Sequence, residues 1–182
     1  MKAKYQEKFL VHKIQQNGDT ESFAILYDLY IQKIYRFNYI KLSNREEAED
    51  LTSEVFLKAW NYLIGNPDQV IKSFSGLIYR ITRTTLVDFY RQNNKKEVSI
   101  DDIADIPSDA GIIKKLGAKQ EAERVLKTLK KMKREYQEII VLKYIEELST
   151  SEIGDILGKN ITNVRVTLHR ALKILKKLLE NK

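Results

Sequence analysis

The 182-residue chain contains no cysteine, which excludes disulfide bonds and metal sites built on thiolates. Its two histidines, His12 and His169, are too few and too far apart in the sequence for a typical zinc site. No stretch approaches the roughly 20 apolar residues that span a bilayer, and the N-terminal residues lack the apolar core of a signal peptide. We therefore expect a soluble, cytoplasmic protein without a metal, a cofactor or a membrane-inserted segment.

Proline and glycine are scarce, with two and seven residues respectively, and no segment has the alternating pattern of a strand. Apolar residues instead recur at spacings of three and four, which predicts amphipathic helices. The expected helices span residues 19–41, 44–63 (capped by Ser43 or Asn44), 72–92, 117–130, 133–145, 150–157 and 161–180. They predict an all-α fold of two small modules, residues 1–94 and 117–182, joined by an acidic linker over residues 95–116.

The net charge of +7, from 32 basic and 25 acidic side chains, is unevenly distributed. Residues 1–96 carry +4, residues 97–116 carry −3 and residues 117–182 carry +6. A basic balance points to a polyanionic partner, and a uniformly solubilised surface is not usually so segmented. Within the linker, Ile100, Ile103 and Ile106 are unusual for a free spacer, so docking of the linker on this protein itself stays open.

Residues 149–180 have the features of a helix-turn-helix. Ser149 and Glu152 match a capping box, in which the two side chains satisfy free backbone N–H groups reciprocally. Gly158 suits a left-handed helix end, and Asn160 can cap the next helix. A helix of about two turns, a glycine turn and a longer basic helix is the arrangement of this DNA-binding motif.

On the longer helix, seven side chains lie opposite or beside the apolar stripe of Val164 and Leu168. They are Thr162, Asn163, Arg165, Val166, His169, Arg170 and Lys173. Asn and Arg can each make bidentate hydrogen bonds to purine edges in the major groove, whereas Thr and Lys more often meet phosphates. The alternative is an amphipathic helix whose basic face is merely solvated, but the capped short helix and the glycine turn favour DNA binding.

Three longer motifs follow one another along nearly the whole chain. Residues 47–60 match an acidic-A-E-D-L-x-x-E-V-F-L-x-A-W signature, and residues 77–91 match part of W-L-Y-R-I-A-R-N-x-x-x-D-x-x-R. Residues 148–171 match L-S-x-x-E-I-A-x-x-L-G-x-S-x-x-x-V-R-x-x-L-H-R-A, with Gly154 in the place of the small alanine. In these motifs the chain resembles the bacterial RNA polymerase sigma factors of the extracytoplasmic-function (ECF) group of the sigma-70 family.

The resemblance implies that the first module is sigma region two and the second is region four. It implies that the helix over the first motif docks on the largest subunit of core RNA polymerase. The residues carried over to this contact are Asp50, Leu51, Glu54, Val55, Phe56 and Lys58. Simple helix solubility is the alternative for the two acids, and core packing is the alternative for Phe56 and for Trp60, where we favour it.

The resemblance also implies that the loop after this helix captures a flipped promoter base and that the next helix contacts the −10 element. These roles fall on Asn61, Lys72, Arg80, Arg83, Thr84, Asp88 and Arg91. Core packing is the alternative for the neighbouring aromatic residues, and we favour it for Phe89. The helix-turn-helix would then bind the −35 element, and the acidic linker would thread toward the polymerase cleft unless it is only a solvated tether.

These features predict a sigma factor that directs core RNA polymerase to specific promoters and is not an enzyme. An anti-sigma protein is expected to cover its DNA- or polymerase-binding faces. The alternative is a helix-turn-helix regulator that binds an operator without polymerase, but such a regulator has no need of the first motif. An enzyme acting on nucleic acid would need a carboxylate cluster or a nucleophile, and the only adjacent aspartates, Asp101 and Asp102, lie in the linker.

Overall fold

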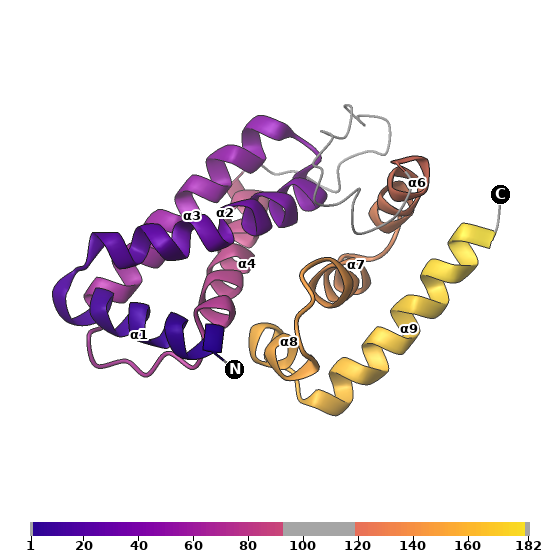
Figure 1. Cartoon of the computed structure of the whole chain (residues 1–182). Helices are drawn as coiled ribbons and strands as arrows, with labels where there is room; N and C mark the ends of the chain where they lie inside the picture. The colour runs from indigo at the N-terminus through magenta and orange to yellow at the C-terminus, as the bar shows by residue number, and fades with distance from the viewer. Residues whose placement is uncertain (1, 93–118, 181–182) are drawn as a thin grey trace. The chain divides into compact units, whose positions relative to one another are not determined.

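The computed structural model describes residues 2–92 and 119–180, which form two separate compact units. Every regular element in these two ranges is a helix (Figure 1), so the predicted all-α fold is confirmed. The predicted linker, residues 95–116, lies outside the described residues, and the boundaries of the two modules stay a prediction. No helix in the described part of the chain combines the length and the apolar character needed to cross a membrane.

The first unit contains α1 (Lys2–Asn17), α2 (Thr20–Leu42), α3 (Arg45–Gly65) and α4 (Phe74–Gln92). Helix α2 contacts each of the other three, and it packs most extensively on α3 (Figure 1). The core of this unit is formed by fully buried apolar side chains such as Leu26 of α2, Leu63 of α3 and Tyr79 of α4. Burial of this apolar area is the main force that holds the four helices together.

Short polar caps set where α2 and α3 begin. Asp19 accepts hydrogen bonds from the backbone N–H groups of Glu21 and Ser22 at 3.2 and 3.4 Å, and Asn44 caps α3 in the same way at 3.2 Å. Hydrogen bonds from the Lys13 and Ser22 side chains hold the pKa of the Asp19 carboxyl below its ordinary value. Ionised Asp19 therefore stabilises the first unit at neutral pH, and this contribution is lost as the pH falls through the lowered pKa.

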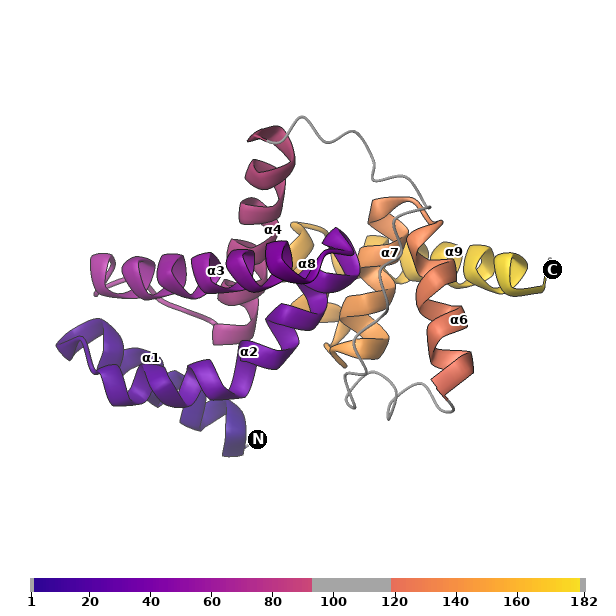
Figure 2. The same cartoon turned by 90° about the horizontal axis from the view of Figure 1, so that it is seen from above.

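The second unit contains α6 (Lys119–Lys130), α7 (Arg134–Ile140), the π-helical turn η1 (Val141–Ile145), α8 (Thr150–Leu157) and α9 (Ile161–Glu180). The long helix α9 is the element on which α6, α7 and α8 all pack (Figures 1 and 2). Its fully buried Val164 lies in the same core as Ile139, Leu142 and Ile153 of the shorter helices. The remaining faces of α9 are thereby left at the surface.

The helices agree with the sequence prediction in the second unit more closely than in the first. Helices α8 and α9 have the predicted ends, and α4 begins two residues later than predicted. The predicted helix over residues 133–145 is α-helical only to Ile140 and then continues as one π-helical turn. Helix α1 is not anticipated by the sequence analysis, because its buried side chains, Leu10, Val11 and Ile14, span little more than one turn.

Glu147 lies in the connection between η1 and α8 and adopts a φ of 58°, in the left-handed region that residues other than glycine rarely adopt. This backbone costs an L-residue about 1 kcal/mol, because its Cβ crowds the following carbonyl. The next residue, Leu148, donates its backbone N–H to the Leu142 carbonyl at 3.0 Å, and Ser149 caps α8. These flanking bonds hold the connection in a strained conformation that glycine would relieve.

We expect Glu147→Gly to raise the free energy of unfolding by about 1 kcal/mol, because glycine adopts this φ without the Cβ clash. Urea unfolding of the full chain, followed by circular dichroism, measures the change. Glu147→Ala is the matched control, since it removes the same carboxylate but keeps Cβ, and no stabilisation is expected from it. Equal unfolding midpoints for the two variants would contradict the assigned strain.

Candidate protein- and nucleic-acid-binding surfaces

The predicted DNA-binding face of α9 is exposed along its whole length. All seven side chains are accessible to solvent, namely Thr162, Asn163, Arg165, Val166, His169, Arg170 and Lys173. The opposite side of the helix is closed by Val164 and Ala171, which have no exposed surface. The structure therefore leaves the polar and basic face free for entry into a major groove, which admits one α-helix.

The turn that leads into α9 has the predicted caps. The Ser149 N–H donates to the Glu152 carboxylate at 3.0 Å, and the Glu152 N–H donates to the Ser149 hydroxyl at 3.2 Å, so the capping box is confirmed. Gly158 adopts a φ of 65° at the end of α8, as predicted. The Asn160 side chain accepts the Asn163 N–H at 2.8 Å and caps α9. Each of these bonds satisfies a group that a helix end would otherwise leave unpaired.

Gly154 occupies the closest backbone approach in this motif. A Cβ at this position would lie 2.7 Å from the carbonyl oxygen of Lys159, closer than real Cβ atoms come. The Lys159 N–H donates to the Gly154 carbonyl at 3.0 Å across the same turn. The missing side chain therefore allows α8 to turn tightly into α9, which sets the face that α9 exposes.

The residues carried over to polymerase docking divide between the surface and the core of the first unit. Asp50 and Glu54 are exposed on α3, and Lys58 is half-buried, with its Nζ 2.7 Å from the Glu54 carboxylate and 3.3 Å from Thr85. The other three carried-over side chains are buried, with exposed fractions of 2% for Leu51, 0% for Val55 and 3% for Phe56. These three stabilise α3 on α2 from inside, and their carried-over role in polymerase docking stays a prediction.

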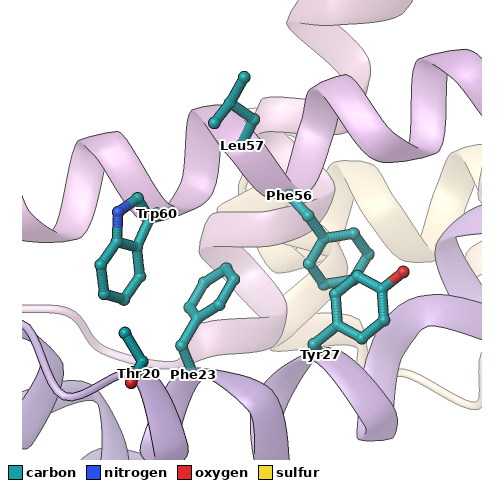
Figure 3. Close-up of a pocket in the computed structure, with 6 residues that line it drawn as sticks. All are labelled: Thr20, Phe23, Tyr27, Phe56, Leu57 and Trp60. Atoms are coloured by element: carbon teal, nitrogen blue, oxygen red, sulfur yellow. The ribbon is translucent and has the colours of Figure 1, made fainter.

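An open apolar groove of about 360 Å³ lies between α2 and α3, and Figure 3 shows Phe23 and Tyr27 of α2 facing Trp60 and Phe56 of α3. The Phe23 and Trp60 ring centroids are 5.1 Å apart in an edge-on arrangement, and those of Tyr27 and Phe56 are 4.6 Å apart. Leu57, 61% exposed, and Thr20 complete the lining. Trp60, which we expected in the core, is only partly buried and forms one wall of this groove.

The aromatic groove residues on α2 belong to the apolar repeat that predicts the helix over residues 19–41, and the sequence assigns them no other role. Phe23 and Tyr27 continue the spacing of the buried Leu26 and Tyr30, so periodicity alone does not separate the groove from the core. Leu57 is the groove residue that the sequence could have identified. It is a large apolar side chain three residues after Glu54 and next to Lys58, and so lies on the polar face of α3. The acids of α3 and the groove therefore adjoin on one helix.

The residues of α4 that the resemblance assigns to the −10 element form an exposed stripe. Spacings of four and three place Arg80, Thr84, Asp88 and Arg91 on the same face of the helix, and all four are exposed. Asn61 in the last turns of α3 and Lys72 in the loop before α4 are also exposed, whereas Arg83 is half-buried at the edge of the stripe. Among the aromatic residues Tyr79 is fully buried, while Phe89 is only partly buried.

Helix α1 holds the loop between α3 and α4. The Gln15 side-chain amide donates to the carbonyl oxygens of Asn66 and Gln69 at 2.7 and 3.0 Å. Gln16 donates to the Pro67 carbonyl at 3.1 Å. These bonds join residues more than 50 positions apart, and no local pattern in the sequence could have found them. They fix the backbone of the loop that the resemblance assigns to base capture.

Residues 26–96 match the family model "Sigma-70 region 2", and residues 122–175 match "Sigma-70, region 4". The chain is 31% identical over 193 residues to the ECF RNA polymerase sigma factor SigW of Bacillus subtilis, covering 96% of this chain and 99% of SigW. Its fold is similar to CnrH solved in complex with the cytosolic domain of CnrY (TM-score 0.71, 22% identity, 96% of this chain and 97% of CnrH). It is also similar to the sigma factor RpoE solved with the anti-sigma factor NepR from Bartonella quintana (TM-score 0.70, 20% identity, 89% and 99% covered).

We expect Gln15→Ala to loosen the loop after α3, because two backbone carbonyls lose their side-chain donor. Hydrogen–deuterium exchange should be faster for the peptide that covers residues 64–72, without a change elsewhere in the first unit. Gln32→Ala is the control, since Gln32 is an exposed glutamine of α2. Unchanged exchange of the loop in Gln15→Ala would show that the two bonds do not hold it.

Proposed function

The chain belongs to the ECF RNA polymerase sigma factors of the sigma-70 family, and we propose that its first helical unit docks on the polymerase and acts on the −10 element while its second unit reads the −35 element. As a sigma factor it directs core RNA polymerase to specific promoters, and phosphodiester chemistry belongs to the polymerase. The observation that carries the division is the fully exposed basic face of α9 in the second unit, opposite its buried side, together with the acidic and apolar surface of α3 in the first.

In the first unit, Asp50 and Glu54 of α3 bind core polymerase together with the groove beside them. Exposed acids next to an apolar groove fit a helical partner that carries an apolar stripe flanked by basic side chains. Leu57 and Trp60 supply the apolar contact area, because both line the groove and keep exposed surface. The buried residues of the same motif, such as Val55, hold α3 on α2 so that this surface is preformed.

In the second unit, α9 enters the major groove of the −35 element. Asn163 and Arg165 lie near its N-terminal end and can read purine edges through bidentate hydrogen bonds. Lys173 lies farther along the same face and meets phosphates. Asn163 and Arg165 therefore contribute to the choice of base sequence, whereas Lys173 contributes affinity for any sequence.

The α4 stripe and the loop before it act on the −10 element. Arg80, Arg83 and Arg91 supply positive charge for the DNA backbone, and Thr84 adds a hydroxyl between them. A loop held by Gln15 offers a base that leaves the stack a surface of fixed shape, which lowers the cost of opening the duplex. The acidic linker, whose residues lie outside the described ranges, connects this step with −35 binding.

An anti-sigma protein holds the free chain by covering the polymerase-binding or DNA-binding faces. The support is the likeness in fold to the sigma factor RpoE, which was solved with the anti-sigma factor NepR, and to CnrH, which was solved with the cytosolic domain of CnrY. The apolar groove of the first unit is the surface at which we expect the anti-sigma protein to bind, because an exposed apolar patch bordered by polar residues is typical of a protein interface.

Run-off transcription with core polymerase on genomic promoter fragments tests this function. Promoter-dependent transcripts are expected only when the chain is added. An operator-binding regulator is the competing function, and it is not favoured because the first unit matches sigma region 2. Tight DNA binding by the chain alone, with no promoter-dependent transcript, would overturn the sigma function.

We expect replacement of Asp50 and Glu54 by alanine to weaken core-polymerase binding about tenfold or more, equivalent to about 1.4 kcal/mol. Fluorescence titration of the labelled chain with core polymerase measures the affinity. Asp28→Ala with Glu121→Ala is the matched control, because it removes two exposed acids that lie outside the α3 surface. If both double variants bind core equally well, the docking assignment is wrong.

We expect Arg165→Ala and Lys173→Ala to have different effects on promoter use. Loss of a base-reading arginine should cost about 1–3 kcal/mol and relax the preference at one base pair of the −35 element. Loss of a phosphate-binding lysine should weaken binding to all promoters alike. It should also make the slope of log binding constant against log salt concentration shallower by about 1. Transcription from a library of −35 variants separates the two patterns, and a uniform loss in both variants would reject base reading by Arg165.

A further inference from the structure

A dense group of basic residues lies in the second unit, apart from the DNA-binding face of α9. Lys127, Lys130, Lys131, Lys133 and Arg134 fall within eight positions that contain no acid. We call these five residues the α6–α7 basic patch, because they lie at the end of α6, in the turn and at the beginning of α7. None of them belongs to a surface assigned above.

The turn between α6 and α7 exposes Lys131 and Lys133. The Lys131 and Met132 N–H groups both donate, at 3.1 Å, to carbonyls three residues earlier, which tightens the turn. Met132 is buried and anchors the turn in the core, so its neighbours Lys131 and Lys133 are exposed, as is Lys127 one helical turn earlier. Met132 thus fixes the turn in the core, and the lysines on either side of it form a basic surface.

The patch concentrates positive charge at short range. Burial, and then the positive charge of Lys127, lower the pKa of half-buried Lys130. Crowded cations of this kind gain from an anion placed over them, because it offsets their mutual repulsion. The partner that this surface fits is therefore a polyanion.

An ion pair joins the first turn of α7, next to the patch, to the turn before the DNA-reading helix. Glu135, in the first turn of α7, pairs with Lys159 in the turn immediately before α9. Lys133 is two residues from Glu135, and Asn160, which caps α9, is the next residue after Lys159. In three-helix DNA-binding motifs, basic residues that precede the first helix can reach the DNA next to the recognition helix. The patch has the same place in this unit.

We propose that the α6–α7 basic patch contacts the phosphate backbone of the duplex that flanks the element read by α9, chiefly through Lys131 and Lys133. This proposal rests on the proposed function of α9. Lysine ammonium groups act as point charges on phosphate and carry no sequence information, so the patch adds grip without changing promoter choice. An acidic protein surface is the other class of partner, and the test below distinguishes it.

The test measures DNA binding by holoenzyme assembled from core polymerase and the full chain. The DNA is a genomic fragment that gives a promoter-dependent transcript in the run-off assay. Lys131→Gln with Lys133→Gln should make the slope of log binding constant against log salt concentration shallower by about 2, because each phosphate contact releases about 0.9 counterion on binding and two contacts are lost. The order of preference among promoters should stay unchanged. Lys8→Gln with Lys33→Gln is the control, because it removes two exposed lysines from the first unit. Circular dichroism checks that both double variants are folded.

The outcomes separate the two levels of the account. A salt slope like that of the wild type, or a loss equal to that of the control, overturns the patch proposal while α9 binding stands. Weaker assembly with core polymerase at an unchanged salt slope for DNA also overturns it, because the patch would then bind protein. If wild-type holoenzyme makes no promoter-dependent transcript, the proposed function itself fails.

Discussion

The close approach between Gly154 and Lys159 is the contact on which the DNA-reading half of the molecule depends. A Cβ at position 154 would lie 2.7 Å from the Lys159 carbonyl oxygen, so in this chain the turn from α8 into α9 is closer than the alanine of the family motif would allow without a shift. The capping box before α8 and the left-handed Gly158 after it fix the two ends of the same short helix. With both ends fixed, the rotation of α9 follows, and Val164 faces the core while Arg165 and Val166 face solvent.

In the first unit, one helix, α3, both packs in the core and presents a surface to a partner. Helix α3 does so by its periodicity, because Leu51 and Val55 face inward while Asp50, Glu54 and Leu57 face outward. The aromatic pairs between α2 and α3 lie at the boundary and leave a groove open there. The contact between α2 and α3 thus stabilises the unit and also forms the apolar surface that a partner can bury.

The sequence was most informative where structure is decided by neighbouring residues. Ser149, Glu152, Gly158 and Asn160 act over three or four positions, and the caps they predict are present. Motif resemblance identified the family, but a motif does not state which side of a helix each letter occupies. Phe56 was therefore assigned to a partner although it is 3% exposed.

What could not be predicted depends on contacts between distant parts of the chain. The bonds from Gln15 to Asn66 and Gln69 require α1 to lie beside the loop after α3, which no local periodicity encodes. The left-handed backbone of Glu147 is imposed by its flanking hydrogen bonds against the preference of the residue itself. The groove escaped notice because Phe23 and Tyr27 share the spacing of core residues.

Photocrosslinking in the holoenzyme–promoter complex tests the division of labour most directly. p-Benzoylphenylalanine would replace Val166 of α9 in one variant and Leu57 of α3 in another, because both side chains are exposed and neither supports the core. The account predicts that position 166 crosslinks to promoter DNA at the −35 element and that position 57 crosslinks to the largest polymerase subunit. Crosslinking of position 166 to DNA without polymerase, together with no polymerase adduct from position 57, would contradict it.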